Sequence, residues 1–158
     1  MGLGEAPPEA VMERERERPA DYAYRAGHAW FLARDGRHGE ARANIAWIAA
    51  DDWARLADDV NRLAALAEVA HAIALTGDPT AAAGAYDRIA PYADRNVVNG
   101  RGAGGYGSAE LPLGLLADVL GRREDARAHL TRAVARNTAM GADWWAAAAR
   151  RALDGLGA

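Results

Sequence analysis

The residues that could do chemistry in this 158-residue chain are few and widely separated. The four histidines, His28, His38, His71 and His129, form no close pair with metal-ligand spacing. All 19 basic residues are Arg and there is no Cys, which excludes Schiff-base lysines, an intact Walker A loop, disulfides and thiolate chemistry. Ser108 is the only serine, and no Gly-x-Ser-x-Gly motif surrounds it. We therefore expect no catalytic residue, no metal and no cofactor.

Charge and hydropathy narrow the class of partner. The formal net charge of −3 argues against direct binding of nucleic acid. Residues 1–18 lack the apolar core of a signal peptide, and no run reaches the roughly 18 apolar residues of a membrane span. These observations predict a cytoplasmic protein that does not bind a membrane. We expect a charged N-terminal tail or short helix at 1–18 and a single domain at 19–158.

Alanine-rich segments separated by glycine turns predict an all-α fold. Alanine is the residue most easily held in a helix, and Gly36, Gly77, Gly121 and Gly141 each separate two segments of helical period. No segment alternates at period two for long, so no strand is expected. The expected helices lie near residues 20–34, 38–50, 59–76, 79–91, 108–120, 123–138 and 143–155.

Three of the turns begin the same short pattern. An alanine follows five residues after the turn glycine, at Ala41, Ala82 and Ala126, and apolar residues follow at the next helical turns. Helical hairpins repeated in this way predict a solenoid, in which each hairpin buries its apolar face against the next.

The third copy of the pattern resembles a tetratricopeptide repeat. Its small and apolar signature positions are matched in spacing by Leu113, Gly114, Ala126, Leu130 and Ala133. The resemblance implies about three antiparallel helical hairpins and a capping helix in a short right-handed superhelix. It also implies that the first helix of each hairpin lines the concave groove.

A longer stretch narrows the resemblance. The segment 91–98, the glycine-rich loop with Gly107-Ser108, and the turn at 140–142 resemble a particular helical-repeat tail. That tail is the C-terminal region of large actinobacterial ATPase regulators of the LuxR and adenylate-cyclase types, and the resemblance covers roughly residues 20–155. It implies a sensing or docking scaffold without the ATPase, cyclase or DNA-binding parts. The pair Trp144-Trp145 is expected to cover the open end of the last hairpin.

The repeat register predicts which side chains point into the groove. Equivalent positions of the three first helices hold Trp30, His71 and Leu115, and small alanines occupy most other inner positions. Neighbouring turns and the glycine-rich loop complete the candidate groove. The candidate binding residues are Trp30, Arg34, His71, Tyr106, Ser108 and Asp118. An alternative stays open, in which the segment 92–107 closes the groove and His71 is a hydrogen-bonded core residue; His38 and His129 are expected on solvated faces.

Residues 99–107 contain a literal GxGxxG at Gly100, Gly102 and Gly105. A dinucleotide site needs a preceding strand and a βαβ unit, and the sequence predicts neither. The segment is therefore either a passive linker between hairpins or a lid over the groove, with Tyr106 closing on the ligand.

The leading hypothesis is a non-enzymatic interaction or sensing module that binds a protein segment or a small apolar molecule in its concave groove. The resemblance links such a module to transcriptional or signalling regulation. The alternative is a small cofactor-independent enzyme or ligand-sequestering protein of secondary metabolism, with His71 as the proton carrier. A third possibility is a purely architectural protein that forms a homodimer through its hairpin ends.

Overall fold

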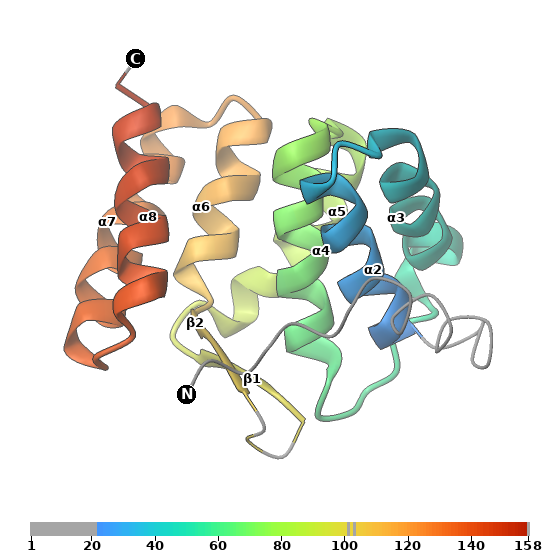
Figure 1. Ribbon diagram of the computed structural model, residues 1–158, viewed down its shortest axis with the longest axis horizontal. Coiled ribbons are helices and arrows are strands. Elements are labelled where there is room, and N and C mark those ends of the chain that lie inside the picture. The colour runs from blue at the N-terminus through green and yellow to red at the C-terminus, as the bar shows by residue number, and fades with distance from the viewer. Residues whose placement is uncertain (1–21, 101, 103, 158) are drawn as a thin grey trace.

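The computed structural model describes residues 22–100, 102 and 104–157, and within them the fold is mostly helical, as predicted (Figure 1). The α-helices are α2 (Tyr22–Arg34), α3 (His38–Trp53), α4 (Arg62–Thr76), α5 (Pro79–Ile89), α6 (Glu110–Val119), α7 (Arg123–Ala139) and α8 (Asp143–Gly155). A 3-10 helix, η1 (Ala90–Tyr92), and two strands, β1 (Asn96–Asn99) and β2 (Gly104–Ser108), connect α5 to α6. The expected tail at 1–18 lies outside the described residues.

The glycine turns end their helices as the sequence predicts. Gly36, Gly77, Gly121 and Gly141 have φ values of +78°, +69°, +71° and +69°, in the left-handed region that glycine adopts without steric cost. After one of these turns, the Asp78 carboxylate accepts hydrogen bonds from the next free backbone N–H groups and starts α5. All seven predicted helices are present within a few residues of their expected bounds.

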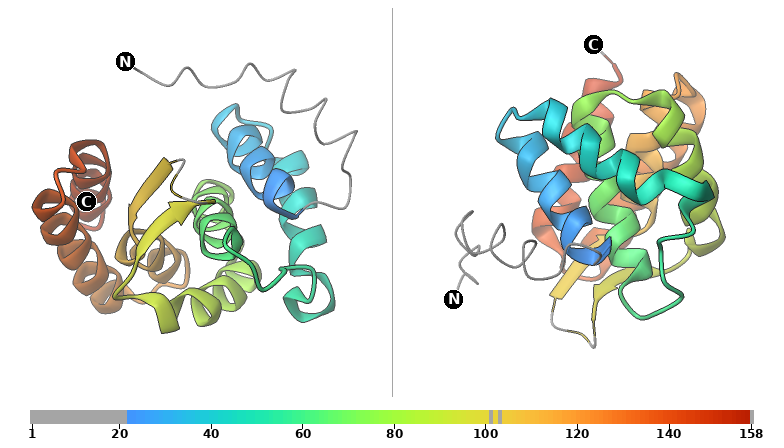
Figure 2. Two further views of the ribbon diagram at one scale, coloured as in Figure 1. Left: turned by 90° about the horizontal axis from the view of Figure 1, so that it is seen from below. Right: turned by 90° about the vertical axis from the view of Figure 1, so that its right-hand side faces the viewer.

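The helices form two layers. The helices α2, α4, α6 and α8 lie side by side in one layer, and α3, α5 and α7 lie behind them (Figure 1). Seen from below, the layers follow an arc, and the β-hairpin occupies the hollow of that arc between α8 and α4 (Figure 2). The concave side is therefore lined by alternate helices along the chain.

Close crossing of α6 and α7 depends on small residues. A Cβ added to Gly114 would lie 2.6 Å from Leu130 Cγ, well inside van der Waals contact. Ala126 and Ala133 on the facing helix are completely buried. This packing agrees with the small residues that the sequence pattern places at this crossing.

The β-hairpin was not predicted. β1 and β2 pair antiparallel, with Asn99 opposite Gly104 and Val98 opposite Gly105. The glycine-rich sequence has little intrinsic strand preference, so the hairpin depends on contacts with the helices. The Ser108 N–H donates to Asn137 Oδ1 at 2.8 Å, and Trp145 Nε1–H donates to the Gly105 carbonyl at 3.0 Å. These bonds fix β2 to α7 and α8.

Candidate functional site

The structure brings Trp30 and His71 together on the concave side. Trp30 lies on α2 and His71 on α4, and their rings stack with centroids 4.7 Å apart and planes 16° from parallel. The repeat register predicts this neighbourhood, because it puts the two residues at equivalent heights of adjacent first helices. Offset stacking of two flat rings is a favourable arrangement for aromatic side chains.

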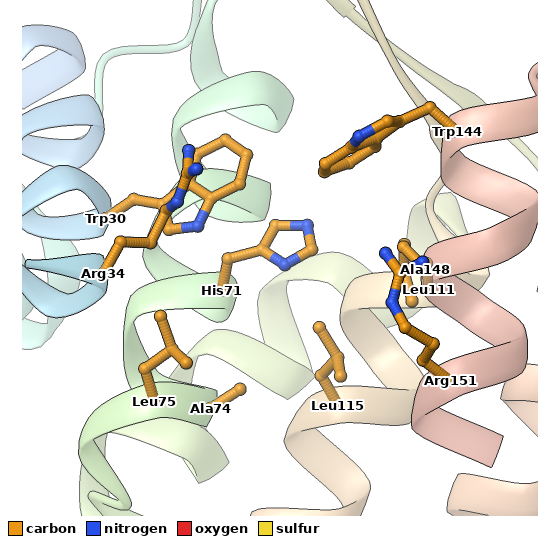
Figure 3. A pocket seen from close by; sticks show the side chains of 10 residues that line it. All are labelled: Trp30, Arg34, His71, Ala74, Leu75, Leu111, Leu115, Trp144, Ala148 and Arg151. Atoms are coloured by element: carbon orange, nitrogen blue, oxygen red, sulfur yellow. The ribbon is translucent and has the colours of Figure 1, made fainter. Parts of the chain in front are cut away.

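The stacked pair forms one wall of a pocket of about 290 Å³ (Figure 3). All four inner helices contribute side chains, and most of them are apolar. The lining residues are Trp30, Arg34, His71, Ala74, Leu75, Leu111, Leu115, Trp144, Ala148 and Arg151. Leu75 and Trp144 are 46% and 58% exposed, which marks the rim of the pocket as an accessible apolar surface.

An aromatic layer closes the hairpin side of this pocket. We define it as Trp30, His71, Tyr106 and Trp145, whose neighbouring ring centroids lie 4.7 to 6.3 Å apart. Tyr106 and Trp145 touch the back of the stacked pair and do not line the pocket. The groove is therefore an open pocket on one side of the layer and a closed core on the other.

A buried acid lies behind the layer, one helical turn before His71 on α4. The Tyr106 hydroxyl donates to Glu68 Oε1 at 2.6 Å. Burial raises the pKa of the Glu68 carboxyl to about 7, although the Tyr106 hydrogen bond acts in the opposite direction. Burial and the adjacent Glu68 carboxylate raise the pKa of Tyr106. Glu68 was not among the residues singled out from the sequence.

His71 is a neutral base inside the pocket. Burial lowers the pKa of its imidazole to about 4, so the ring carries no charge at neutral pH. Its Nε2 atom is fully buried and has no hydrogen-bond partner among the described residues. The expectation of a hydrogen-bonded core histidine is not met at this nitrogen, and a buried polar atom without a partner is unfavourable unless something else satisfies it.

Two guanidinium groups flank the apolar interior. Arg34 on α2 lies over the Trp30 ring, with Cζ 5.9 Å from the ring centroid, and Arg151 lies on the opposite wall, on α8 (Figure 3). None of the described residues that line the pocket carries a carboxylate. The lining is therefore apolar within and positively charged on two sides.

Three of the candidate residues lie outside the pocket. Tyr106 belongs to the aromatic layer, where its ring contacts Trp30 and Trp145, and it does not line the pocket. Ser108 is completely buried at the end of β2, where its Oγ accepts the Glu110 N–H at 3.2 Å and so helps to start α6. Asp118 is exposed near the end of α6, one turn beyond the last pocket residue of that helix, Leu115.

The contribution of α8 was missed from the sequence. Trp144, Ala148 and Arg151 share one face of this helix by their i, i+4, i+7 spacing, and this face lines the pocket. The sequence predicts that α8 is a cap, with both tryptophans covering the end of the last hairpin. This is confirmed for Trp145, which packs against the buried core of the third hairpin as well as into the aromatic layer, whereas Trp144 is exposed at the pocket rim.

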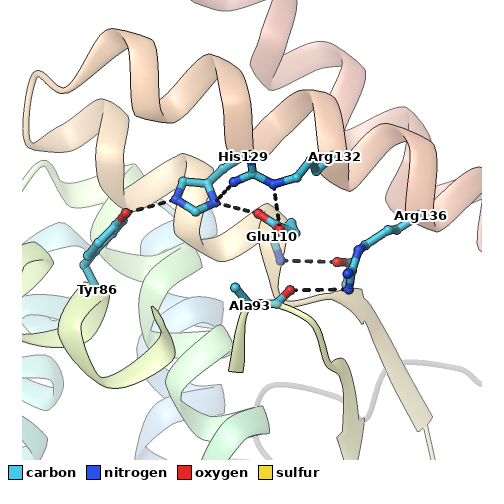
Figure 4. A network of polar contacts seen from close by, with 7 residues as sticks. Tyr86, Ala93, Glu110, His129, Arg132 and Arg136 are labelled. Carbon is cyan, nitrogen blue, oxygen red and sulfur yellow. Dashed lines mark hydrogen bonds and ion pairs between the residues drawn. The ribbon is translucent and has the colours of Figure 1, made fainter. Parts of the chain in front are cut away.

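A second polar cluster joins the second and third hairpins (Figure 4). His129 Nδ1 lies 2.5 Å from Glu110 Oε2, its Nε2 lies 2.9 Å from the Tyr86 hydroxyl, and Arg132 donates to Glu110 at 2.8 Å. The expectation of a solvated His129 is wrong, because its side chain is only 12% exposed. The members form hydrogen bonds with one another, so the cluster links α5, α6 and α7.

Comparisons with family models, with curated proteins and with solved structures found no match to this chain. Within the described residues, no group of His, Cys, Asp and Glu side chains is arranged to hold a metal ion. The same part of the chain contains no helix with both the length and the apolar character needed to cross a membrane.

Proposed function

We propose that this chain is a non-enzymatic sensing module that binds a small, flat, apolar molecule in the pocket bounded by Trp30 and His71. The observation that carries the proposal is the pocket itself, which joins an aromatic wall and an exposed apolar rim. Pockets of this kind are the usual sites for small molecules.

The dimensions of the pocket favour a small molecule over a protein segment. A cavity of about 150 Å³ holds one benzene molecule, so about 290 Å³ suits a molecule of one or two rings. The aromatic layer blocks the groove on the hairpin side, so an extended peptide has no continuous path through it.

The contents of the pocket favour binding over catalysis. His71 is the lining residue most able to exchange a proton, but burial lowers its pKa to about 4, so it is a weak base at neutral pH. No hydroxyl or carboxylate nucleophile accompanies it among the described lining residues.

A ligand in this position would touch all four inner helices at once. A ligand that binds only the folded state stabilises it more as the free ligand concentration rises above Kd, and a ligand in this pocket would link the two ends of the arc. This coupling supports a sensing role, and the resemblance to regulator tails supports a place for the module in transcriptional or signalling control.

The experiment titrates the ¹⁵N-labelled protein with 2-naphthamide, a neutral two-ring probe, and follows the indole N–H signals. We expect the signals of Trp30 and Trp144 to shift with occupancy. Two tryptophans outside the pocket provide internal controls, whose indole N–H signals should not shift. Trp47 on α3 lies between the guanidinium groups of Arg25 and Arg55, and Trp53 is buried. No shift at either pocket tryptophan would overturn the proposal.

A matched pair of variants locates the probe. Ala148→Leu fills the pocket and should weaken binding by about tenfold or more, because three added carbon atoms occupy the ligand's space. Ala147→Leu makes the same change on the same helix outside the pocket lining, and it should leave the affinity within about twofold. Equal affinities for the two variants would place the probe elsewhere.

A further inference from the structure

The positive charge of this pocket is concentrated on two facing walls. Arg34 projects from α2 beside the Trp30 ring, and Arg151 projects from α8 across the pocket (Figure 3). The two helices are the first and last of the inner layer. A ligand that bridges them therefore meets a guanidinium group on each side.

Within the described part of the chain, no hydrogen bond or ion pair occupies Arg151. The neighbouring Arg150 is engaged differently, since its guanidinium donates to Thr138 Oγ1 at 3.0 Å on the outer side of α8. The guanidinium group of Arg151 in the pocket is therefore not bonded to any described residue. Guanidinium groups recognise carboxylates through paired, charge-assisted hydrogen bonds.

The rest of the lining limits what the ligand can carry. Leu111, Leu115 and Ala148 offer no polar side-chain atom, and the Trp30 ring presents a flat face. A cationic group would be repelled by the Arg151 guanidinium, and none of the described lining residues carries a carboxylate to attract it. An uncharged aromatic body with an acidic group at one end fits both the interior and the rim.

We infer that the ligand is a planar aromatic carboxylate, whose rings lie against Trp30 and His71 and whose carboxylate pairs with Arg151. This inference rests on the proposed function and specifies the chemical class of its ligand.

The test compares three probes of one shape by isothermal titration calorimetry on the full chain. They are 2-naphthoate, which is anionic, 2-naphthamide, which is neutral, and 2-naphthylmethylammonium, which is cationic. We expect 2-naphthoate to bind about tenfold more tightly than 2-naphthamide, as hydrogen bonds to a charged group commonly provide. The cationic probe should bind most weakly, and added salt should narrow the differences.

Variants assign the preference to the Arg151 guanidinium group. Arg151→Gln should remove most of the preference for 2-naphthoate and change the affinity for 2-naphthamide by less than about twofold. Arg34→Gln should weaken both probes to a similar extent, because Arg34 packs on Trp30, and should leave most of the preference for 2-naphthoate. Arg150→Gln, with the same charge change on the other side of α8, should leave the preference intact.

The outcomes separate this inference from the proposal on which it rests. Equal or weaker binding of 2-naphthoate than of 2-naphthamide overturns the inference and leaves the binding pocket standing. A preference for the anion that survives in Arg151→Gln also overturns it, because the carboxylate is then recognised elsewhere. Absence of binding by all three probes overturns the proposed function, and the inference with it.

Discussion

Glu68 and His71 lie one turn apart on α4, and burial shifts their titrations in opposite directions. Folded Glu68 keeps its proton up to a pH of about 7, whereas an exposed Glu loses it near 4.5; folded His71 stays neutral down to about pH 4, whereas an exposed His is protonated below 6.5. Between pH 4.5 and 6.5, the folded pair therefore binds one proton, on Glu68. The unfolded pair also binds one, on His71. Because the pH dependence of stability follows the difference in bound protons, the two contributions cancel in this range.

Replacing either residue removes the cancellation. In Glu68→Gln, which keeps an oxygen for the Tyr106 hydroxyl, only His71 remains: the unfolded chain binds more protons between pH 4 and 6.5, so this contribution to stability is lost as the pH falls. In His71→Phe, which keeps a ring on Trp30, only Glu68 remains, and its contribution is lost as the pH rises from 4.5 to 7. At ~1.4 kcal/mol per pH unit for one proton, each change amounts to ~3 kcal/mol over its range.

The assay is urea unfolding followed by far-ultraviolet circular dichroism, at pH values from 4 to 8, for the wild type, both single variants and the double variant. Differences from the wild type at each pH remove the contributions of other titrating groups. Relative to the wild type, Glu68→Gln should gain stability as the pH rises from 4.5 to 7, and His71→Phe should gain it as the pH falls from 6.5 to 4. Differences that do not change with pH would show that these groups titrate as exposed ones, and that the aromatic layer does not keep water out.

Two further predictions concern packing. Gly114→Ala should lower the free energy of unfolding by about 1–3 kcal/mol, because its new methyl group meets Leu130 on the facing helix. The control is Gly39→Ala, at a helical glycine with no atom within 4 Å of the added carbon, and it should leave the stability unchanged or raise it. Equal Tm values for the two variants would contradict the close crossing of α6 and α7. Trp145→Ala should cost about 2–4 kcal/mol because it opens the aromatic layer, whereas Trp144→Ala at the exposed rim should cost less than about 1 kcal/mol. Thermal melts measure the stability of all these variants. A larger loss of stability for Trp144→Ala than for Trp145→Ala would contradict the exposed position of Trp144 at the rim.

The helices could be predicted from sequence because their signals are local. Alanine content, apolar spacing and a glycine at each turn all act within a few residues, and all seven helices follow from them. The β-hairpin could not be predicted in this way. Its strand geometry depends on Asn137 and Trp145, which lie on helices that follow it by many residues. A Cβ at Gly107, where φ is +74°, would lie 2.7 Å from Asn137 Oδ1, so this glycine serves a tertiary contact as well as a turn.

The candidate site was only partly predictable for a related reason. Equivalence between repeats places Trp30 beside His71 without any knowledge of the other helices. It does not show where the groove ends along α6, which is why Asp118 was included, nor that the helix begins after Ser108. Arg151 was missed because the terminal helix α8 was considered only as a cap on the repeat array. The helix packs on α7, and its inner face also lines the pocket.

The hairpin explains why one concave surface holds both a buried acid and an open pocket. A short helical array alone would present a continuous groove from α2 to α8. Here Tyr106 and Trp145 fill the half that contains Glu68, where the carboxyl is covered and hydrogen-bonded. On the other side of the layer, Ala74 and Ala148 are too small to meet across the groove, and the space stays open. The large rings and the small alanines together set the depth of the pocket, so its depth depends on the hairpin while its charge depends on the first and last inner helices.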